Sequence, residues 1–194
     1  MPTLTATNSL STKLATIEPH IGNTPLLRIE GFHDNENVQI FAKLEWKQLS
    51  GSVKARAAYN IIKNAILENK LTPDKILLDA SSGNTGIAYA TIGKKIGLNV
   101  TILLPENASS ERKNILKSLG AEIIYTSKFG GTDEAQDAAK ELAERYPEKY
   151  FYADQYSNEN NWKAHYHGTA EEIIHEKPQL DYFIAGLGTT GTFV

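Results

Sequence analysis

The chain has 194 residues, of which 41% are hydrophobic and 22% charged, and its formal net charge is −3. This balance is typical of a soluble globular protein of one or two domains, and the small negative charge gives no reason to expect nucleic acid or an anionic membrane as a partner. The absence of cysteine excludes disulfides and thiolate metal sites, and no stretch approaches the roughly 20 apolar residues of a membrane span.

The first fifteen residues are polar and rich in Thr and Ser, without an apolar block. This composition predicts a poorly ordered arm and not a secretory signal. Residues 21–25, Ile-Gly-Asn-Thr-Pro, then combine a turn signal with a proline. Apolar stretches on either side of a polar loop at residues 31–37 predict two short strands, at residues 26–29 and 38–46.

A helical pattern begins at Ser52. Apolar side chains recur at every fourth position from Val53 to Ala65, which predicts an amphipathic helix of about four turns that ends before Pro73. Lys54 lies in its first turn, next to Ser52 as a candidate N-cap. The positive end of the helix dipole there slightly disfavours protonation of the lysine amine.

Beyond Pro73, short apolar runs alternate with segments of helical period. Strands that alternate with helices of about 10–15 residues predict an α/β fold with parallel sheets covered by helices on both faces. The expected strands are residues 76–80, 100–104, 122–126, 150–153 and 182–185, and the expected helices are residues 84–96, 109–119, 132–146 and 162–175.

Residues 81–86, Ser-Ser-Gly-Asn-Thr-Gly, lie between a predicted strand and a predicted helix. Free backbone N–H groups at such a position hold carboxylates or phosphates well, and the glycines let the backbone approach a ligand closely. Ser82, Asn84 and Thr85 add side-chain hydrogen bonds. Taken alone, the stretch fits equally well a tight strand-to-helix turn capped by Ser or Asn.

Residues 186–192, Gly-Leu-Gly-Thr-Thr-Gly-Thr, contain the G-x-G-x-x-G pattern of dinucleotide sites after an apolar run. The acidic residue that such sites place about 20 positions later would fall beyond Val194. Dinucleotide sites also use the first strand–helix unit of a domain, whereas this stretch follows several. Its three threonine hydroxyls suit a single phosphate dianion better, so we favour a phosphate site.

Four stretches in this order resemble pyridoxal-phosphate (PLP) enzymes of the cysteine synthase and cystathionine β-synthase group. They are residues 21–26, Gly51-Ser52-Val53-Lys54, residues 81–86 and residues 186–192. The resemblance implies the fold type II architecture, like that of the tryptophan synthase β subunit, with two open, largely parallel sheets and helices on both faces.

The resemblance also implies roles for individual residues. The lysine of the G-S-x-K stretch carries the cofactor as a Schiff base, the 81–86 loop and a later glutamine hold the substrate carboxylate, and a G-T-G-G-T loop surrounds the cofactor phosphate. For the glutamine, an exposed loop residue is an equal alternative. The expected site residues are Lys54 for catalysis and cofactor attachment; Asn84, Gly188, Thr189, Thr190, Gly191 and Thr192 for the cofactor; and Ser81, Ser82, Gly83, Asn84, Thr85 and Gln155 for the substrate.

The implied reaction is a β-replacement on an O-activated L-serine, either O-acetylserine or O-phosphoserine. Sulfide or another thiol would add to an aminoacrylate intermediate to give L-cysteine or an analogue, with Lys54 as the base that removes the α-proton. The implied partners are these small molecules and, in the full-length form, a second copy in a cytoplasmic homodimer.

Two departures from the family pattern around the lysine leave its branch open: Gln48-Leu49 replaces the usual Asn-Pro before the glycine-serine pair, and Ala55 replaces an aspartate. A third departure is the length of the chain. In the phosphate loop, Thr190 stands where the family usually has a glycine. The threonine resembles relatives that use O-phosphoserine. His165 and His167 point to different sides of their predicted helix without a third ligand, so we expect surface or packing residues and no metal site.

Family members are longer than this chain, so we expect a fragment. It would contain a smaller mobile domain with the substrate loop, residues 48–154, and part of a larger cofactor-binding domain, residues 1–47 and 155–194. The group that faces the pyridine nitrogen would lie beyond Val194. The alternatives are a PLP-dependent serine or threonine dehydratase-type lyase, a catalytically inactive fragment or binding module, and a nucleotide-binding oxidoreductase.

Overall fold

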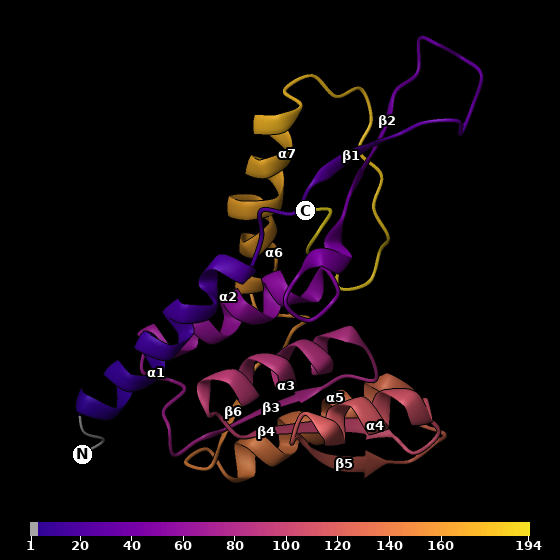
Figure 1. Cartoon of the computed structure of the whole chain (residues 1–194). Coiled ribbons are helices and arrows are strands. Elements are labelled where there is room, and N and C mark those ends of the chain that lie inside the picture. Colours follow the sequence, from indigo (N-terminus) through magenta and orange to yellow (C-terminus); the bar gives the residue numbers. More distant parts are fainter. Residues whose placement is uncertain (1–3) are drawn as a thin grey trace.

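The computed structural model describes residues 4–194, and its centre is a parallel sheet of four strands within that range. In Figure 1 this sheet and its helices form one layered part of the molecule, and a helical arm with a strand pair forms the other. The strand order is β5-β4-β3-β6. The strands are β3 (Ile76–Ala80), β4 (Val100–Pro105), β5 (Glu122–Thr126) and β6 (Tyr150–Tyr152).

The side chains of β3 and β4 alternate between two apolar layers, as the pleat of a strand requires. Leu77 and Ile102 belong to the larger core, together with side chains of α3 (Asn84–Ile96). Leu78 and Leu103 face the other way, against Ala135 and Ala139 of α5 (Gly131–Arg145). The sheet is therefore covered on both faces, as the sequence predicts. Helix α4 (Ser110–Ser118) contributes Leu116 to the larger core.

The prediction of a poorly ordered arm is wrong from residue 4 onward, because residues Leu4–Ile17 form helix α1. Leu10, Leu14 and Ile17 are buried in the same core as α2 (Lys54–Leu67). These apolar residues recur at helical spacing, and tertiary packing against α2 outweighs the polar composition of the segment. The part of the predicted arm at residues 1–3 lies outside the described residues.

A second sheet consists of β1 (Leu26–Ile29) and β2 (Ile40–Lys43), paired antiparallel with Leu26 opposite Lys43. The intervening loop returns the chain directly, whereas a parallel pair would need a crossover connection. The second predicted strand is shorter than expected, since η2 (Glu45–Lys47) follows it as a 3-10 turn.

The predicted helix at 162–175 is one continuous helical segment with a widened middle. It comprises α6 (Asn160–Ala164), the π-helical turn η3 (His165–Ala170) and α7 (Glu171–Glu176). π-helical turns are rare and occur frequently at functional sites. Here the widened turn includes buried His165 and Thr169.

The prediction of a strand at residues 182–185 is wrong, since this segment has no regular secondary structure. A strand requires a neighbour that pairs its N–H and C=O groups, and none of the described strands lies beside it in a sheet. Tyr182 and Ile184 are 87% and 92% exposed. Across residues 4–194, no helix combines the length and apolarity needed to cross a bilayer.

Candidate active site

Lys54 is the first residue of α2 and lies against the glycine-threonine loop. Its backbone N–H approaches Ser52 Oγ at 3.4 Å, and its Nζ lies 3.4 Å from Thr189 Oγ1. Partial burial lowers the pKa of the Lys54 amine. The neutral amine, which is the nucleophilic and basic form, is therefore easier to reach than on a solvated lysine. The structure brings together two predicted site residues that are 135 positions apart.

The loop at residues 186–192 combines open and tightly packed glycines. A Cβ added to Gly186 or Gly188 would meet no atom within 4 Å, so the backbone there is accessible. A Cβ on Gly191 would lie 2.4 Å from Asn161 Oδ1, a contact that only glycine avoids. Thr190 has φ = 64°, the left-handed region where glycine is favoured. The backbone angle at position 190 is therefore one that glycine, the usual residue of the family there, adopts more easily than threonine.

The loop at residues 81–86 is shaped by the hydroxyl of Ser81. This buried oxygen accepts hydrogen bonds from the N–H groups of Gly83, at 3.3 Å, and Gly86, at 3.0 Å. Ser81 thus stabilises the turn into α3 from within the loop, while the N-cap position of the helix is Gly83. Asn84, the first residue of α3, is exposed, and Ser82 is half-buried. These two side chains remain accessible to a ligand.

Gln155 lies beneath this loop and is only 5% exposed, so the interpretation as an exposed loop residue is wrong. Its Nε2 donates to the carbonyl of Ala80 at 2.9 Å, and its Oε1 accepts from Thr85 Oγ1 at 2.6 Å. Its backbone N–H donates to Asp79 Oδ2 at 3.3 Å. One end of the amide holds the end of β3 and the other holds Thr85 of the 81–86 loop, and the predicted substrate contact of Gln155 stays a prediction.

Asn161 is a residue that the sequence analysis missed. Its Nδ2 donates to the carbonyl of Gln155 at 2.7 Å and to Thr189 Oγ1 at 2.8 Å. These contacts complete a hydrogen-bonded series that runs from Thr85 through Gln155, Asn161 and Thr189 to Lys54. The series links the three stretches that contain expected ligand-binding residues, at 51–54, 81–86 and 186–192. Three asparagines occur at residues 158–161, and no local pattern distinguishes the one that points inward.

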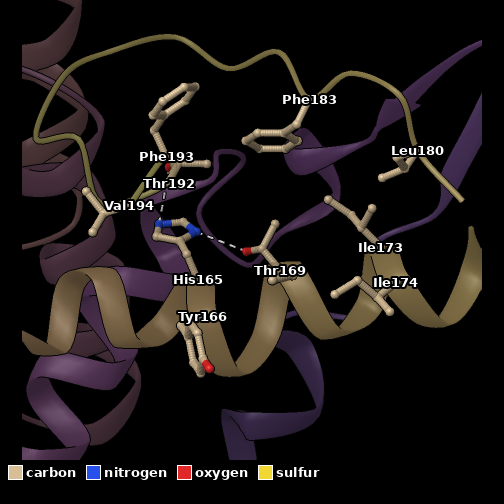
Figure 2. Close-up of a pocket in the computed structure, with 11 residues that line it drawn as sticks. His165, Tyr166, Thr169, Ile173, Ile174, Leu180, Phe183, Thr192, Phe193 and Val194 are labelled. Atoms are coloured by element: carbon tan, nitrogen blue, oxygen red, sulfur yellow. Dashed lines mark hydrogen bonds between the residues drawn. The ribbon is translucent and has the colours of Figure 1, made fainter. Parts of the chain in front are cut away.

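His165 is 3% exposed and lies between two threonines, as Figure 2 shows. Its Nδ1 is 2.9 Å from Thr169 Oγ1, and its Nε2 is 3.4 Å from Thr192 Oγ1 of the glycine-threonine loop. Burial, reinforced by the charges of Lys54 and Arg56, lowers the pKa of His165 to about 4. His165 is a neutral packing residue near pH 7.

The cavity in Figure 2 has a volume of about 230 Å³ and lies between η3, α7 and the end of the chain. Its lining is largely apolar, including Ile173, Leu180 and Phe193.

The second histidine of the predicted pair, His167, is exposed. No three His, Asp or Glu side chains in residues 4–194 converge on a possible metal site.

A partly buried ionic cluster around Arg56 was also missed. Arg56, which is 3% exposed, forms ion pairs with Glu45 at 2.8 Å and Glu172 at 2.6 Å, and it donates to Thr24 Oγ1 at 3.1 Å. Burial alone would raise the pKa of Glu172, but hydrogen bonds from Arg56, the Asn23 N–H and Lys43 lower it to about 2. The cluster joins the 21–25 stretch, η2 and α7 to the helix that begins with Lys54.

Comparison with known proteins is consistent with this arrangement. Residues 17–194 match the family model described as pyridoxal-phosphate dependent enzyme. The cysteine synthase of Aquifex aeolicus is 43% identical over 183 residues, which are 92% of this chain and 56% of the relative. Cysteine synthase B of Escherichia coli is 38% identical over 180 residues, 92% of this chain and 59% of the relative. The chain thus spans just over half the length of these relatives.

Solved structures give the same result for the fold. A cysteine synthase from Entamoeba histolytica has a TM-score of 0.84 at 36% identity, with 90% of this chain and 53% of the other covered. An O-acetylserine dependent cystathionine β-synthase from Helicobacter pylori has a TM-score of 0.84 at 35% identity, with 91% and 58% covered. The predicted α/β fold class is confirmed.

Proposed function

The chain belongs to the pyridoxal-phosphate dependent enzyme family, and from this membership we propose that it takes part in PLP-dependent synthesis of L-cysteine. The proposed substrates are an O-activated L-serine, with O-acetylserine as the first choice, and sulfide. The choice of O-acetylserine is supported by the Helicobacter pylori relative, whose name states that dependence. The observation that carries the proposal is the approach of Lys54 Nζ to Thr189 Oγ1.

The residues present fit the cofactor. An aldehyde condenses with a neutral amine, and burial lowers the pKa of Lys54 in favour of that form. The backbone at Gly186 and Gly188 is accessible, as close contact with a phosphate requires. Thr189 places a hydroxyl beside the amine. Lys54 would hold the aldehyde carbon, and the hydroxyls of Thr189 and Thr192 would donate to the phosphate.

Each predicted residue has a limited task in this proposal. The cofactor would supply an electron sink for the negative charge that develops at the substrate α-carbon. Lys54 would accept the α-proton at Nζ once the substrate amine has replaced it at the aldehyde carbon. The N–H groups of the 81–86 loop that do not donate to Ser81, with the side chains of Ser82 and Asn84, would bind the substrate carboxylate and so orient the Cα–H bond toward Lys54. Thr85 and Gln155 would hold that loop in place through their mutual hydrogen bond.

The proposed domain division places residues 48–154 in a smaller domain and residues 1–47 with 155–194 in a larger one. Contacts that cross this boundary at the site include those from Thr85 to Gln155, from Gln155 to Ala80 and from Lys54 to Thr189. Movement between the domains would therefore change the distance between the substrate loop and the phosphate loop. A homodimer and a cytoplasmic location belong to the same proposal.

Product analysis tests the proposed reaction. The protein is incubated with PLP, O-acetyl-L-serine or O-phospho-L-serine, and sulfide, and cysteine and pyruvate are quantified. We expect cysteine as the main product from O-acetylserine, and loss of its formation in Lys54→Ala. Lys63→Ala, on the exposed part of the same helix, is the matched control and should retain activity. Pyruvate as the main product would indicate a dehydratase-type lyase, and failure to form either product would contradict the proposal.

A further inference from the structure

We infer that Asn161 is a positioning residue that holds the Thr189 hydroxyl as a hydrogen-bond donor for the cofactor phosphate. The inference rests on the proposed function, because it assigns the anion that Thr189 would meet. It adds a residue that lies outside the three stretches expected to bind ligands. Asn161 touches none of the proposed reacting atoms and would act through Thr189.

The orientation of the Asn161 amide is determined by its neighbours. The side chain is buried, with the residue 4% exposed, and both hydrogens of Nδ2 have acceptors. One acceptor is the carbonyl of Gln155, which can only accept, so the nitrogen and not the oxygen of the amide must face it. The same nitrogen therefore donates its second hydrogen to Thr189 Oγ1.

This donation decides what the Thr189 hydroxyl can do. A hydroxyl has one hydrogen and two acceptor lone pairs. The Nδ2 of Asn161 donates to the Thr189 oxygen at 2.8 Å and occupies one of its acceptor positions. The hydrogen of the Thr189 hydroxyl then points away from the Asn161 amide and is available to an anion. A hydroxyl that donates to a charged oxygen makes a stronger hydrogen bond than one between neutral groups.

A second contact fixes Asn161 against the loop backbone. The Oδ1 of Asn161 is buried and has no hydrogen-bond partner within the described residues, and it faces the Cα of Gly191. A Cβ at that glycine would lie only 2.4 Å from Oδ1, so the loop approaches the amide more closely than any side chain would permit. Asn161 thus determines both the direction of the Thr189 hydroxyl and the distance of the loop from α6.

The test is a double-mutant cycle on the dissociation constant of PLP. Asn161→Ala should weaken PLP binding about tenfold, as expected for losing one well-oriented hydrogen bond to a charged group. In the Thr189→Val background, which lacks the hydroxyl, the same substitution should change the affinity less than about twofold. In the Thr189→Ser background, which keeps the hydroxyl, the full effect of about tenfold should return.

Two controls separate positioning from general structural damage. Pyridoxal lacks the phosphate, so its affinity should be unchanged by Asn161→Ala. Asn160→Ala alters the preceding asparagine, whose side chain bonds to Asn158 and not to Thr189, and should leave PLP affinity unchanged. Urea unfolding of each variant confirms that it is folded under the binding conditions.

The outcomes distinguish this inference from the proposed function. Equal effects of Asn161→Ala with threonine, valine or serine at position 189 would overturn the positioning role, as would an equal loss of pyridoxal affinity. Failure of the unsubstituted protein to bind PLP would overturn the proposed function and the inference with it. If the unsubstituted protein binds PLP but the effects of the Asn161 and Thr189 substitutions on PLP affinity are simply additive, only the inference would be overturned.

Discussion

The guanidinium of Arg56 reaches the carboxylate of Glu172 at 2.6 Å across 116 positions of sequence. This pair connects the first turn of α2, two residues after Lys54, to α7, which continues the helical segment of Asn161 and His165. A partly buried ionic contact therefore joins the start of the helix that carries Lys54 to the helical segment that carries Asn161.

Removing the centre of this cluster should destabilise the fold. Arg56→Ala leaves the partly buried Glu45 without its cation and Glu172 with Lys43 alone. The loss of unfolding free energy should therefore exceed the roughly 1 kcal/mol of a surface pair and stay below the roughly 3–5 kcal/mol of a fully buried one. The measurement is the free energy of unfolding in urea. Lys63→Ala, which breaks an exposed pair with Glu18, is the control and should cost less than about 1 kcal/mol. Equal losses in the two variants would contradict the account of the cluster.

Asp79 should make the folded state less stable as the pH rises. Burial raises the pKa of this carboxyl to about 7, despite hydrogen bonds from backbone N–H groups that favour the charged form. The folded state then holds a proton that the unfolded state has already released, so stability falls between about pH 4 and pH 7.

Thermal unfolding at pH 5 and pH 8 measures this contribution of Asp79. Asp79→Asn removes the titrating group, so the midpoint of the variant should fall less over this range than that of the unsubstituted protein. Asp74→Asn, at an exposed position, should show the same pH dependence as the unsubstituted protein. A steeper fall in Asp79→Asn would contradict the assignment.

His165 should stay neutral well below the usual range of a histidine. Burial, with the nearby charges of Lys54 and Arg56, lowers its pKa to about 4. Between about pH 6.5 and pH 4 the imidazole is protonated in the unfolded state but not in the folded state. This residue therefore lowers the free energy of unfolding as the pH falls through that range. Its imidazole proton resonances, followed by NMR between pH 5 and 8, should show no titration midpoint within that range. A midpoint near 6.5 would show that the ring is accessible and that its contacts with Thr169 and Thr192 are not maintained.

Thr190 should carry backbone strain that glycine relieves. A non-glycine residue at φ = 64° costs about 1–2 kcal/mol, whereas glycine also increases the freedom of the unfolded chain by about 0.4–1 kcal/mol. Thr190→Gly should therefore stabilise the protein by up to about 1 kcal/mol in urea unfolding. Thr190→Ala keeps a Cβ in the same conformation and should bring no gain. A similar gain in both variants would show that the backbone angle is not the cause.

Local patterns predicted most elements of the sheet part of the molecule. The ranges expected for β3, α3 and β5 match the structure, because each apolar run or helical period is bounded by turn residues. Helix α1 was missed, since its polar composition hid the spacing of Leu10, Leu14 and Ile17. The strand expected at 182–185 depends on a pairing partner, which no local pattern can supply.

Local sequence patterns also predicted only part of the candidate site. Short motifs predicted Lys54, the 81–86 loop and the 186–192 loop as candidate site residues, because glycines and small polar residues cluster there in sequence. The contacts that connect these stretches come from residues without a motif. Asn161 lies among other asparagines, and the three charged residues Glu45, Arg56 and Glu172 meet only after folding. Long-range hydrogen bonds and ion pairs leave no local sequence signal.

The most direct test of the central claim is to locate the residue that binds PLP. The protein is incubated with PLP, treated with borohydride to make any amine linkage permanent, digested and analysed by mass spectrometry. We expect the label on the peptide that contains Lys54, at one equivalent per chain, and no stable label in Lys54→Ala. Labelling at another lysine, or undiminished labelling of Lys54→Ala, would contradict the assignment of Lys54 as the residue that holds the cofactor.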